Sequence, residues 1–253
     1  MKYILRSLQT LFPFLHDIRY KFKFYIMNLM RTPHEYDFKA IKLFKPDTNQ
    51  VFIDIGSNRG EAILSMLIMT NSNTQIIGFE PNSLIFKKLK NYFNKNEDVV
   101  IHNLGLADEN REHELYVPFY RKWMFDGLGS FKLEEAKNWL QNRLWLYDEN
   151  KLTIKKIKCQ IRKLDDFQLK PYFIKIDVQG YEFEVLKGGV ETIKTHLPII
   201  LVENINEEHM NFLKQFGYEF YSFKNGKFLE GIGELNTFCI NRERHRELKF
   251  ELK

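Results

Sequence analysis

From residue 51 onward, the apolar residues alternate between short continuous runs and runs with helical spacing. Short β-branched runs at 51–55, 75–80 and 99–107 predict buried strands. Between them, apolar residues at helical spacing predict helices over 60–70 and 81–96. This β-α-β-α-β alternation is typical of a parallel sheet covered by helices, so we expect an α/β fold.

The alternation breaks after residue 107. Two strands are expected at 113–119 and 152–161, and the segment between them, 120–150, contains all three tryptophans. A connection of this length is uncommon, so we expect an insertion or lid that borders the acceptor pocket. The alternative is an ordinary amphipathic helix over 139–147 whose tryptophans are core or dimer contacts.

The regular pattern then resumes and continues to residue 242. We expect strands at 172–178 and 198–204, helices at 181–196 and 207–217, and a final antiparallel pair at 218–223 and 236–242. The predicted organisation is a helical N-terminal extension (1–45), a main domain (46–242) with an insertion at 118–160, and a charged tail (243–253).

Composition adds few constraints. The 253 residues, 44% hydrophobic and 28% charged, suit one globular domain with extensions. The net charge of +5 fits an acidic substrate or an anionic membrane surface, but no lysine-arginine block is dense enough to predict nucleic-acid binding. Cys159 and Cys239 lack metal-binding spacing, so we expect reduced core residues in a cytoplasmic protein.

The first 31 residues combine aromatic and basic side chains without a continuous apolar run. Pro13, His16, Asp17 and Arg19 interrupt the segment too early for a secretory core or a membrane span. The segment fits peripheral membrane association through an interfacial amphipathic helix, a helix packed on the domain, or a subunit contact such as that of a dimer.

The strongest local signal is VFIDIGSNRGE, in which a strand ending near Asp54 leads through a glycine-rich turn into a helix. Gly56 allows the sharp turn, and Gly60 allows close approach of helix and ligand. The amino terminus of the helix offers free N–H groups to an anionic part of a ligand.

The second signal is GFEP, in which Glu80 ends the next strand and Pro81 follows it. Neighbouring parallel strands end at the same edge of a sheet, where an acidic side chain can accept hydrogen bonds from both hydroxyls of a ribose. The glycine loop and Glu80 together predict a ligand that contains adenosine.

The glycine loop also discriminates between adenosine ligands. Ser57, Asn58 and Arg59 stand between its two glycines, so the central glycine that admits a pyrophosphate in G-x-G-x-x-G is missing. S-adenosylmethionine has no phosphate and tolerates a bulkier loop. The pattern therefore favours a methyltransferase over the alternative of a nicotinamide-dependent oxidoreductase.

A third signal is YFIKIDVQGYEFEVLKGG, in which a buried strand ends at Asp177 and turns at Gly180. Asp177 is expected at the carboxyl edge of the sheet, beside the strand that carries Asp54. Ligands of open α/β sheets bind along that edge.

In this order, DIGSNRGE, GFEPN, IKIDVQGYEFEVLKGG and PIILVEN resemble the pattern of FkbM family O-methyltransferases, over residues 37–204. The resemblance implies a Rossmann-like seven-stranded methyltransferase sheet, mostly parallel with an antiparallel C-terminal strand, and S-adenosylmethionine as the donor. It also implies methylation of a hydroxyl on a sugar, polyketide or related small molecule, and a bacterial surface polysaccharide is the acceptor we expect.

The resemblance also assigns residues to the cofactor. By likeness, the cofactor-binding positions are Asp54, Gly56, Asn58, Gly60, Glu80, Gly105 and Leu106, the last two beside the adenine. We add Ser57, Pro81 and Asp177, which lie in the same turns. One departure is Gln179, where the family usually has Glu; Gln retains the size and an acceptor oxygen, which favours a hydrogen-bonding role.

Methyl transfer to a hydroxyl also needs a group that takes the proton. The candidates are Asp177, Glu203 and Glu182, although Glu182 equally suits compensation of a helix dipole. Asp177, Glu203 and Asn204 form an alternative, oxygen-rich site for a divalent cation such as Mg²⁺. A further alternative is non-enzymatic: a methyltransferase-like fold that acts as a binding module.

Overall fold

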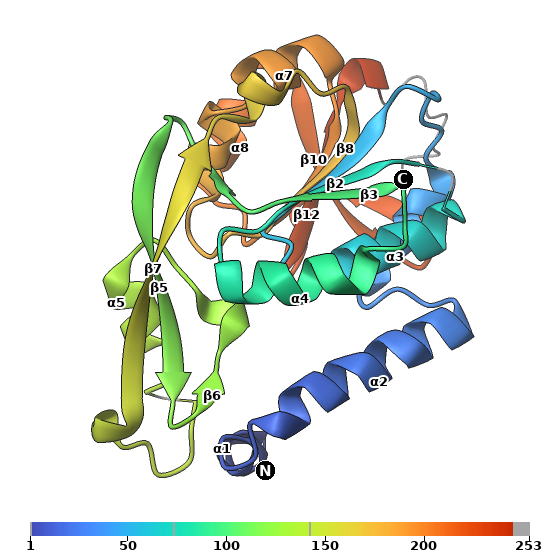
Figure 1. Cartoon of the computed structure of the whole chain (residues 1–253). Helices are drawn as coiled ribbons and strands as arrows, with labels where there is room; N and C mark the ends of the chain where they lie inside the picture. Colours follow the sequence, from blue (N-terminus) through green and yellow to red (C-terminus); the bar gives the residue numbers. More distant parts are fainter. Residues whose placement is uncertain (1, 73, 142, 245–253) are drawn as a thin grey trace.

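The computed structural model describes residues 2–72, 74–141 and 143–244 (Figure 1). Residues 245–253 of the predicted charged tail lie outside the described residues. The helices are α1 (Lys2–Gln9), α2 (Phe14–Met30), α3 (Glu61–Thr70), α4 (Ser83–Phe93), α5 (Leu133–Asn138), α6 (Glu182–Lys187), α7 (Val190–His196) and α8 (Glu207–Lys214), with 3-10 turns η1 (Tyr36–Leu43), η2 (Asp126–Leu128), η3 (Glu149–Lys151) and η4 (Leu164–Phe167).

The main sheet has eight strands in the order β11-β10-β12-β9-β8-β1-β2-β3. They are β1 (Val51–Ile55), β2 (Ile76–Phe79), β3 (Val99–His102), β8 (Pro171–Ile176), β9 (Ile199–Glu203), β10 (Tyr218–Lys224), β11 (Lys227–Glu230) and β12 (Asn236–Asn241). The strands from β9 to β3 pair in parallel, while β12, β10 and β11 are antiparallel.

The fold is therefore α/β, as expected, but the predicted sheet of seven strands with one antiparallel strand is wrong, because the observed sheet has eight strands. The extra strand is β11. Asn225 (φ 52°) and Gly226 (φ 78°) form a tight turn, so the chain folds back and pairs with β10. Phe228 on β11 is buried in the core, which fixes this strand at the edge of the sheet.

Hydrophobic layers cover both faces of the main sheet. α2, η1 and α3 pack on one face, and α6, α7 and α8 contribute to the layer on the other. α3 is buried almost all round, because η1 and α2 cover the side that faces away from the sheet. None of the described helices is long and apolar enough to cross a membrane.

A second sheet, β4-β7-β5-β6, occupies the insertion (Figure 1). Its strands are β4 (Gly105–Leu106), β5 (Arg111–Tyr120), β6 (Trp123–Met124) and β7 (Leu152–Arg162). The single strand predicted over 99–107 is thus divided between the two sheets as β3 and β4. Residues 139–147 are turns and loop where described, and not the helix of the alternative interpretation.

The helix predicted over 181–196 is also divided, into α6 and α7. The interruption falls at Gly188 and Gly189. A Cβ on Gly188 would lie 1.9 Å from the carbonyl oxygen of Ala107, so the backbone of this turn packs directly against the chain just after β4.

Candidate active site

The loop from β1 to α3 takes its path from two glycines. Gly56 has a φ of +84°, and a Cβ on it would lie 1.9 Å from the carbonyl oxygen of Asp177. Gly60 has a φ of +94° and packs against Leu89 and Phe93 on α4. Both positions demand a residue without a side chain, so the loop lies tightly between β8 and α4.

Glu80 is fixed at the end of β2 by the neighbouring backbone. Its two carboxylate oxygens accept hydrogen bonds from the N–H groups of Asn58 and Asn82, both at 2.7 Å. Burial raises the pKa of Glu80 to about 7, although these two hydrogen bonds oppose the shift. The remaining lone pairs of the carboxylate are oriented by the fold and available to a ligand.

Asp54 lies beneath the same loop. It is fully buried, and neither of its carboxylate oxygens has a hydrogen-bond partner among the described residues. Burial raises the pKa of Asp54 to about 6, against the attraction of the Lys175 ammonium. Ser57 donates its hydroxyl to the backbone carbonyl of Asp54 at 2.9 Å, so this serine shapes the loop.

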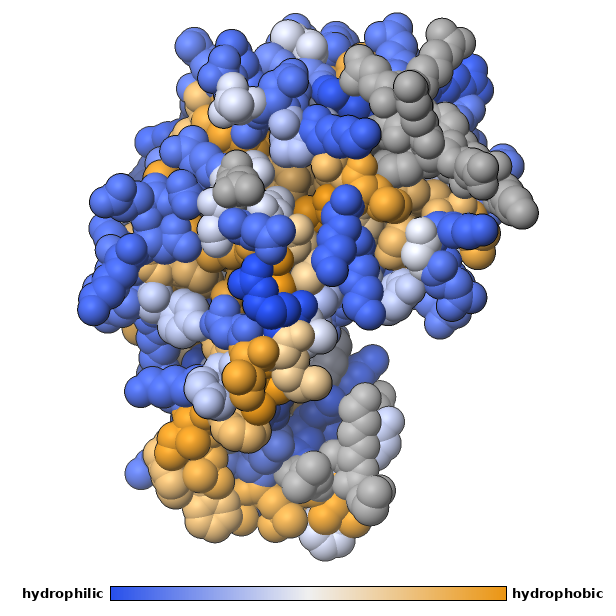
Figure 2. Space-filling model, turned by 90° about the vertical axis from the view of Figure 1, so that its right-hand side faces the viewer, coloured by the Kyte–Doolittle hydropathy of each residue, from blue (hydrophilic) through white to orange (hydrophobic). Residues whose placement is uncertain are grey.

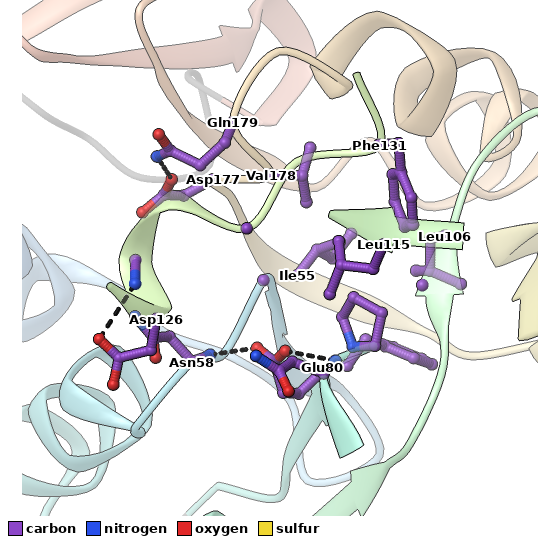
Figure 3. A pocket seen from close by; sticks show the side chains of 17 residues that line it. Ile55, Asn58, Glu80, Leu106, Leu115, Asp126, Phe131, Asp177, Val178 and Gln179 are labelled. Carbon is purple, nitrogen blue, oxygen red and sulfur yellow. Dashed lines mark hydrogen bonds between the residues drawn. The ribbon is translucent and has the colours of Figure 1, made fainter. Parts of the chain in front are cut away.

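A cavity of about 80 Å³ connects these groups (Figure 3). The sequence-predicted residues on its wall are Gly56, Asn58, Glu80, Pro81, Gly105, Leu106 and Asp177; Asp54, Ser57 and Gly60 lie behind the wall. Figure 3 places Asp177 and Gln179 on one side of the cavity and Leu106 and Phe131 on the other, with Glu80 between them.

The insertion supplies wall residues that the sequence analysis missed. They are Leu115, Asp126, Gly127, Gly129 and Phe131. Gly127 approaches the loop itself, since a Cβ on it would lie 3.4 Å from Nδ2 of Asn58. The cavity is smaller than the roughly 300–1,000 Å³ of pockets that hold drug-sized ligands. Four residues of the segment 126–131 thus form part of the cavity wall.

Arg59 joins three segments that are distant in the sequence. Its guanidinium pairs with Asp126 of the insertion and, at 2.7 Å, with Asp17 of α2. It also lies over the ring of Tyr20, with 4.4 Å from the guanidinium carbon to the ring centroid. The Arg59 side chain is only 6% exposed and does not line the cavity. Its guanidinium is therefore occupied by these partners.

Asp177, at the end of β8, is the centre of a charged network. The buried ammonium of Lys175 lies 3.0 Å from its Oδ2, and Gln179 donates its side-chain amide to Oδ1 at 2.8 Å. Gln179 adopts a left-handed conformation (φ 53°) that turns its amide back onto Asp177. The carboxylate side chain of a glutamate has no N–H to donate. Gln179 therefore gives Asp177 a side-chain hydrogen bond that an ionised glutamate at this position cannot give.

Asp177 and Glu203 lie close enough for the charge of one carboxylate to affect the ionisation of the other. Burial alone would raise the pKa of Asp177, but Lys175 and the surrounding hydrogen bonds hold it well below its usual range. Burial and the charge of Asp177 raise the pKa of Glu203. Asp177 therefore ionises at a lower pH than Glu203.

Glu182, a predicted catalytic candidate, lies away from the cofactor cavity. Its carboxylate accepts hydrogen bonds from the backbone N–H groups of Val178, at 3.1 Å, and Gly180, at 3.0 Å. These contacts hold the turn that carries Asp177 and Gln179. The geometry thus gives Glu182 a positioning contact and no contact with the cofactor cavity.

The predicted alternative of a cation site finds no support in the described residues. They contain no group of three His, Cys, Asp or Glu side chains arranged to hold a metal ion. Asp177 and Glu203 do meet, but the charge beside them is the Lys175 ammonium. Asn204 donates its amide to Glu203 at 3.4 Å and its backbone N–H to Leu235.

Comparison with known proteins places this geometry in context. A family model described as the methyltransferase FkbM domain matches residues 54–220. Among solved structures, the methyltransferase FkbM from Methylobacillus flagellatus KT is 14% identical with a TM-score of 0.50, over 81% of this chain and 48% of that chain. The chain thus spans about half the length of that structure, with which it shares the fold.

Two further solved structures show weaker similarity. The S-adenosylmethionine-dependent O-methyltransferase from Thermotoga maritima is 13% identical with a TM-score of 0.36, over 85% of this chain and 69% of that chain. The precorrin-6y C5,15-methyltransferase from Geobacter metallireducens GS-15 is 13% identical with a TM-score of 0.39, over 79% and 82%. No curated protein sequence matches the chain.

Proposed function

This chain belongs to the FkbM methyltransferase family, and from this premise we propose that it is an S-adenosylmethionine-dependent methyltransferase that methylates a hydroxyl group of a sugar or related polar small molecule. The observation that carries the proposal is the chemistry of the cavity wall. Glu80, Asp126 and Asp177 line it, and none of its described lining residues is lysine or arginine.

These acceptors fit the methyl donor. Oδ1 of Asn58, on the cavity wall, is a buried acceptor without a partner among the described residues, which is costly unless a ligand supplies a donor. S-adenosylmethionine carries an ammonium, a sulfonium and ribose hydroxyls. A nicotinamide dinucleotide would instead bring its negative pyrophosphate to the carboxylates, so the nicotinamide alternative is disfavoured.

Different residues of the cavity wall would bind different parts of the donor. Glu80 would accept the ribose hydroxyls, and the apolar side chains of Leu106, Leu115 and Phe131 would contact the adenine. Asn58 would face the amino-acid end, with the buried Asp54 beneath the loop that carries Asn58. With these contacts the chain's own residues fix the donor before the acceptor arrives.

When bound, S-adenosylmethionine supplies a methyl group on a positively charged sulfur. The methyl group would pass from that sulfur to the acceptor oxygen, so the main catalytic task of the chain's own residues would be to align the hydroxyl. Asp177, kept ionised by Lys175, accepts the hydrogen bond of the hydroxyl and directs its oxygen toward the cavity. Methylation makes that proton strongly acidic, so even a weakly basic carboxylate takes it.

A second cavity, of about 500 Å³, adjoins the first and shares Gln179 with it. Trp139 and Phe183 offer aromatic faces there, and Asn206 and His209 are among its polar groups. Flat apolar surface combined with hydrogen-bonding groups suits a polyhydroxylated acceptor. We infer that the acceptor binds in this cavity with its hydroxyl at Asp177, and a bacterial surface polysaccharide precursor is our first candidate.

The test combines binding and chemistry on the purified protein. Calorimetry with S-adenosylmethionine and with NAD is expected to give binding of the first alone. Incubation with sugar acceptors, followed by mass spectrometry, is expected to give products heavier by one methyl group on oxygen. Methylation on nitrogen or carbon only, or binding of NAD in place of S-adenosylmethionine, would refute the proposal.

A further inference from the structure

The outer side of α2 is an apolar stripe that no described residue covers. Phe14, Ile18, Phe22, Tyr25 and Leu29 follow one another at intervals of three or four residues, which places them on one side of the helix. Each is more than half exposed (56–65%). The opposite side of α2 is buried against α3 and α4. The fold thus buries one side of α2 and does not require the apolar residues on the exposed side.

The stripe continues onto α1 and one loop of the insertion. The N–H of Trp145 donates to the Ser7 hydroxyl at 2.8 Å, which holds that loop beside α1. We define the N-terminal surface as the exposed apolar side chains of Tyr3, Ile4, Leu8, Leu11, Phe12, Phe14, Leu15, Ile18, Phe22, Tyr25, Leu29, Met30, Trp145 and Leu146. Figure 2 shows hydrophobic surface gathered at the lower end of the molecule, where Figure 1 has α1 and α2.

The positive charge of the protein is concentrated in the same segment. Residues 1–31 contain six lysines and arginines and one acid, Asp17, for a net charge of +5. That equals the net charge of the whole chain, so the other residues sum to zero. Asp17 is already paired with Arg59 and Lys88. Arg19 and Lys21 are exposed and flank the stripe on its two sides.

We propose that the N-terminal surface binds an anionic lipid membrane, with the apolar side chains in the headgroup and upper acyl region and the basic side chains on the phosphates. An exposed apolar patch of this extent marks an interaction surface. Anionic headgroups attract each nearby lysine or arginine, whereas a second copy on the same face would oppose two segments of charge +5. Tyrosine and tryptophan rings suit the boundary between water and lipid.

The experiment is co-sedimentation of the full chain with vesicles of phosphatidylcholine plus phosphatidylglycerol, and with vesicles of phosphatidylcholine alone. We expect clear preference for the anionic vesicles. The variant Ile18→Ser/Phe22→Ser/Tyr25→Ser should bind at least about tenfold more weakly, because it removes buried apolar area from the lipid contact. Arg19→Glu/Lys21→Glu should lose about fivefold or more per charge.

A matched control removes exposed apolar residues elsewhere. Ile232 and Leu235 are 59% and 45% exposed, and Ile232→Ser/Leu235→Ser should bind vesicles like the wild type. Binding of S-adenosylmethionine, measured on every variant, should stay unchanged and shows that each is folded. This readout also separates failure of the membrane proposal from failure of the proposed function.

Three outcomes would overturn the membrane proposal. The first is equal affinity of the wild type for neutral and anionic vesicles, or none for either. The second is wild-type vesicle binding by the folded stripe variant. The third is a wild-type dimer in light scattering that becomes a monomer in the stripe variant without any vesicle binding, which would make the surface a contact between two copies.

Discussion

At the residue scale, Glu80 gives the most direct test of the cofactor cavity. Glu80→Ala removes the buried acceptor that we assign to the ribose hydroxyls. A hydrogen bond to a charged group contributes about 1.5–3 kcal/mol, so the Kd for S-adenosylmethionine should rise at least about tenfold. Calorimetry measures the change, and Glu191→Ala, at a surface glutamate whose side chain is 74% exposed, is the control. Unchanged affinity would remove Glu80 from the ribose site.

The raised pKa of Glu80 also predicts a pH dependence. Burial lifts it to about 7, so the carboxylate loses its charge as the pH falls through that value. Ribose hydroxyls bind best to the ionised form, so the affinity for S-adenosylmethionine should fall as the pH drops below about 7. In Glu80→Gln, the affinity for S-adenosylmethionine measured by calorimetry between about pH 5 and pH 8 should lose most of its dependence on pH. An unchanged pH dependence would assign the effect to another group.

Substitution of Asp177 tests the methyl-transfer step and should leave the donor site largely intact. Asp177→Asn keeps the shape of the side chain but removes the negative charge that orients the acceptor and takes its proton. Turnover should fall by at least about a hundredfold, the lower end of general acid–base contributions, while part of the S-adenosylmethionine binding survives. Turnover at the wild-type rate on an identified acceptor would make Asp177 structural.

At the scale of elements, Arg59 connects the cofactor loop to α2 and the insertion. Arg59→Gln leaves the Asp126 carboxylate, only 6% exposed, without its partner. Breaking one side of a buried pair costs about 3–5 kcal/mol, whereas removing both charges costs much less. We therefore expect a large loss of unfolding free energy in denaturant titrations of Arg59→Gln, and partial recovery in Arg59→Gln/Asp126→Asn. If the double variant instead loses as much unfolding free energy as Arg59→Gln and Asp126→Asn lose together, the two side chains do not interact.

The sequence predicted the elements that carry local signals. β1, β2 and β8 are continuous apolar runs, and Glu80 is recognisable because it ends one of them. The four-residue β11 has no alternation long enough to detect, and the separation of β3 from β4 depends on the pairing of β4 with β7, more than 50 residues away. Pairing between residues so far apart produces no recognisable pattern in the sequence of the strand itself.

The same limit applies to the candidate site. Leu115 and Phe131 reach the cavity only because β5 and β7 pair into a second sheet, which brings them to the side of the cavity where Leu106 lies. The contact of Arg59 with Asp17 and Asp126 joins segments 42 and 67 residues away along the chain. The sequence predicts that the tryptophan-rich segment borders the acceptor pocket, whereas Gly127 and Gly129 of this segment line the cavity that holds Glu80.

At the scale of the whole molecule, ligand binding should be visible as stability. A ligand that binds only the folded state at a hundred times its Kd adds about 2.7 kcal/mol to the free energy of unfolding. For a chain of this size that is about 5–11 °C in Tm. S-adenosylmethionine should produce this shift in a thermal melt, and NAD at the same concentration should produce none. An equal shift with NAD would revive the oxidoreductase alternative.

The buried arginine of the cofactor loop has a further thermodynamic consequence. Arg59 binds Asp17 of α2, so the helix that carries the apolar stripe and the loop that borders the cofactor cavity share one side chain. Free energies around a closed cycle must balance: whatever factor a lipid surface applies to the affinity for the methyl donor, the donor applies to the affinity for lipid. The supply of methyl donor in the cell would then help to set how much of this enzyme stays at a membrane.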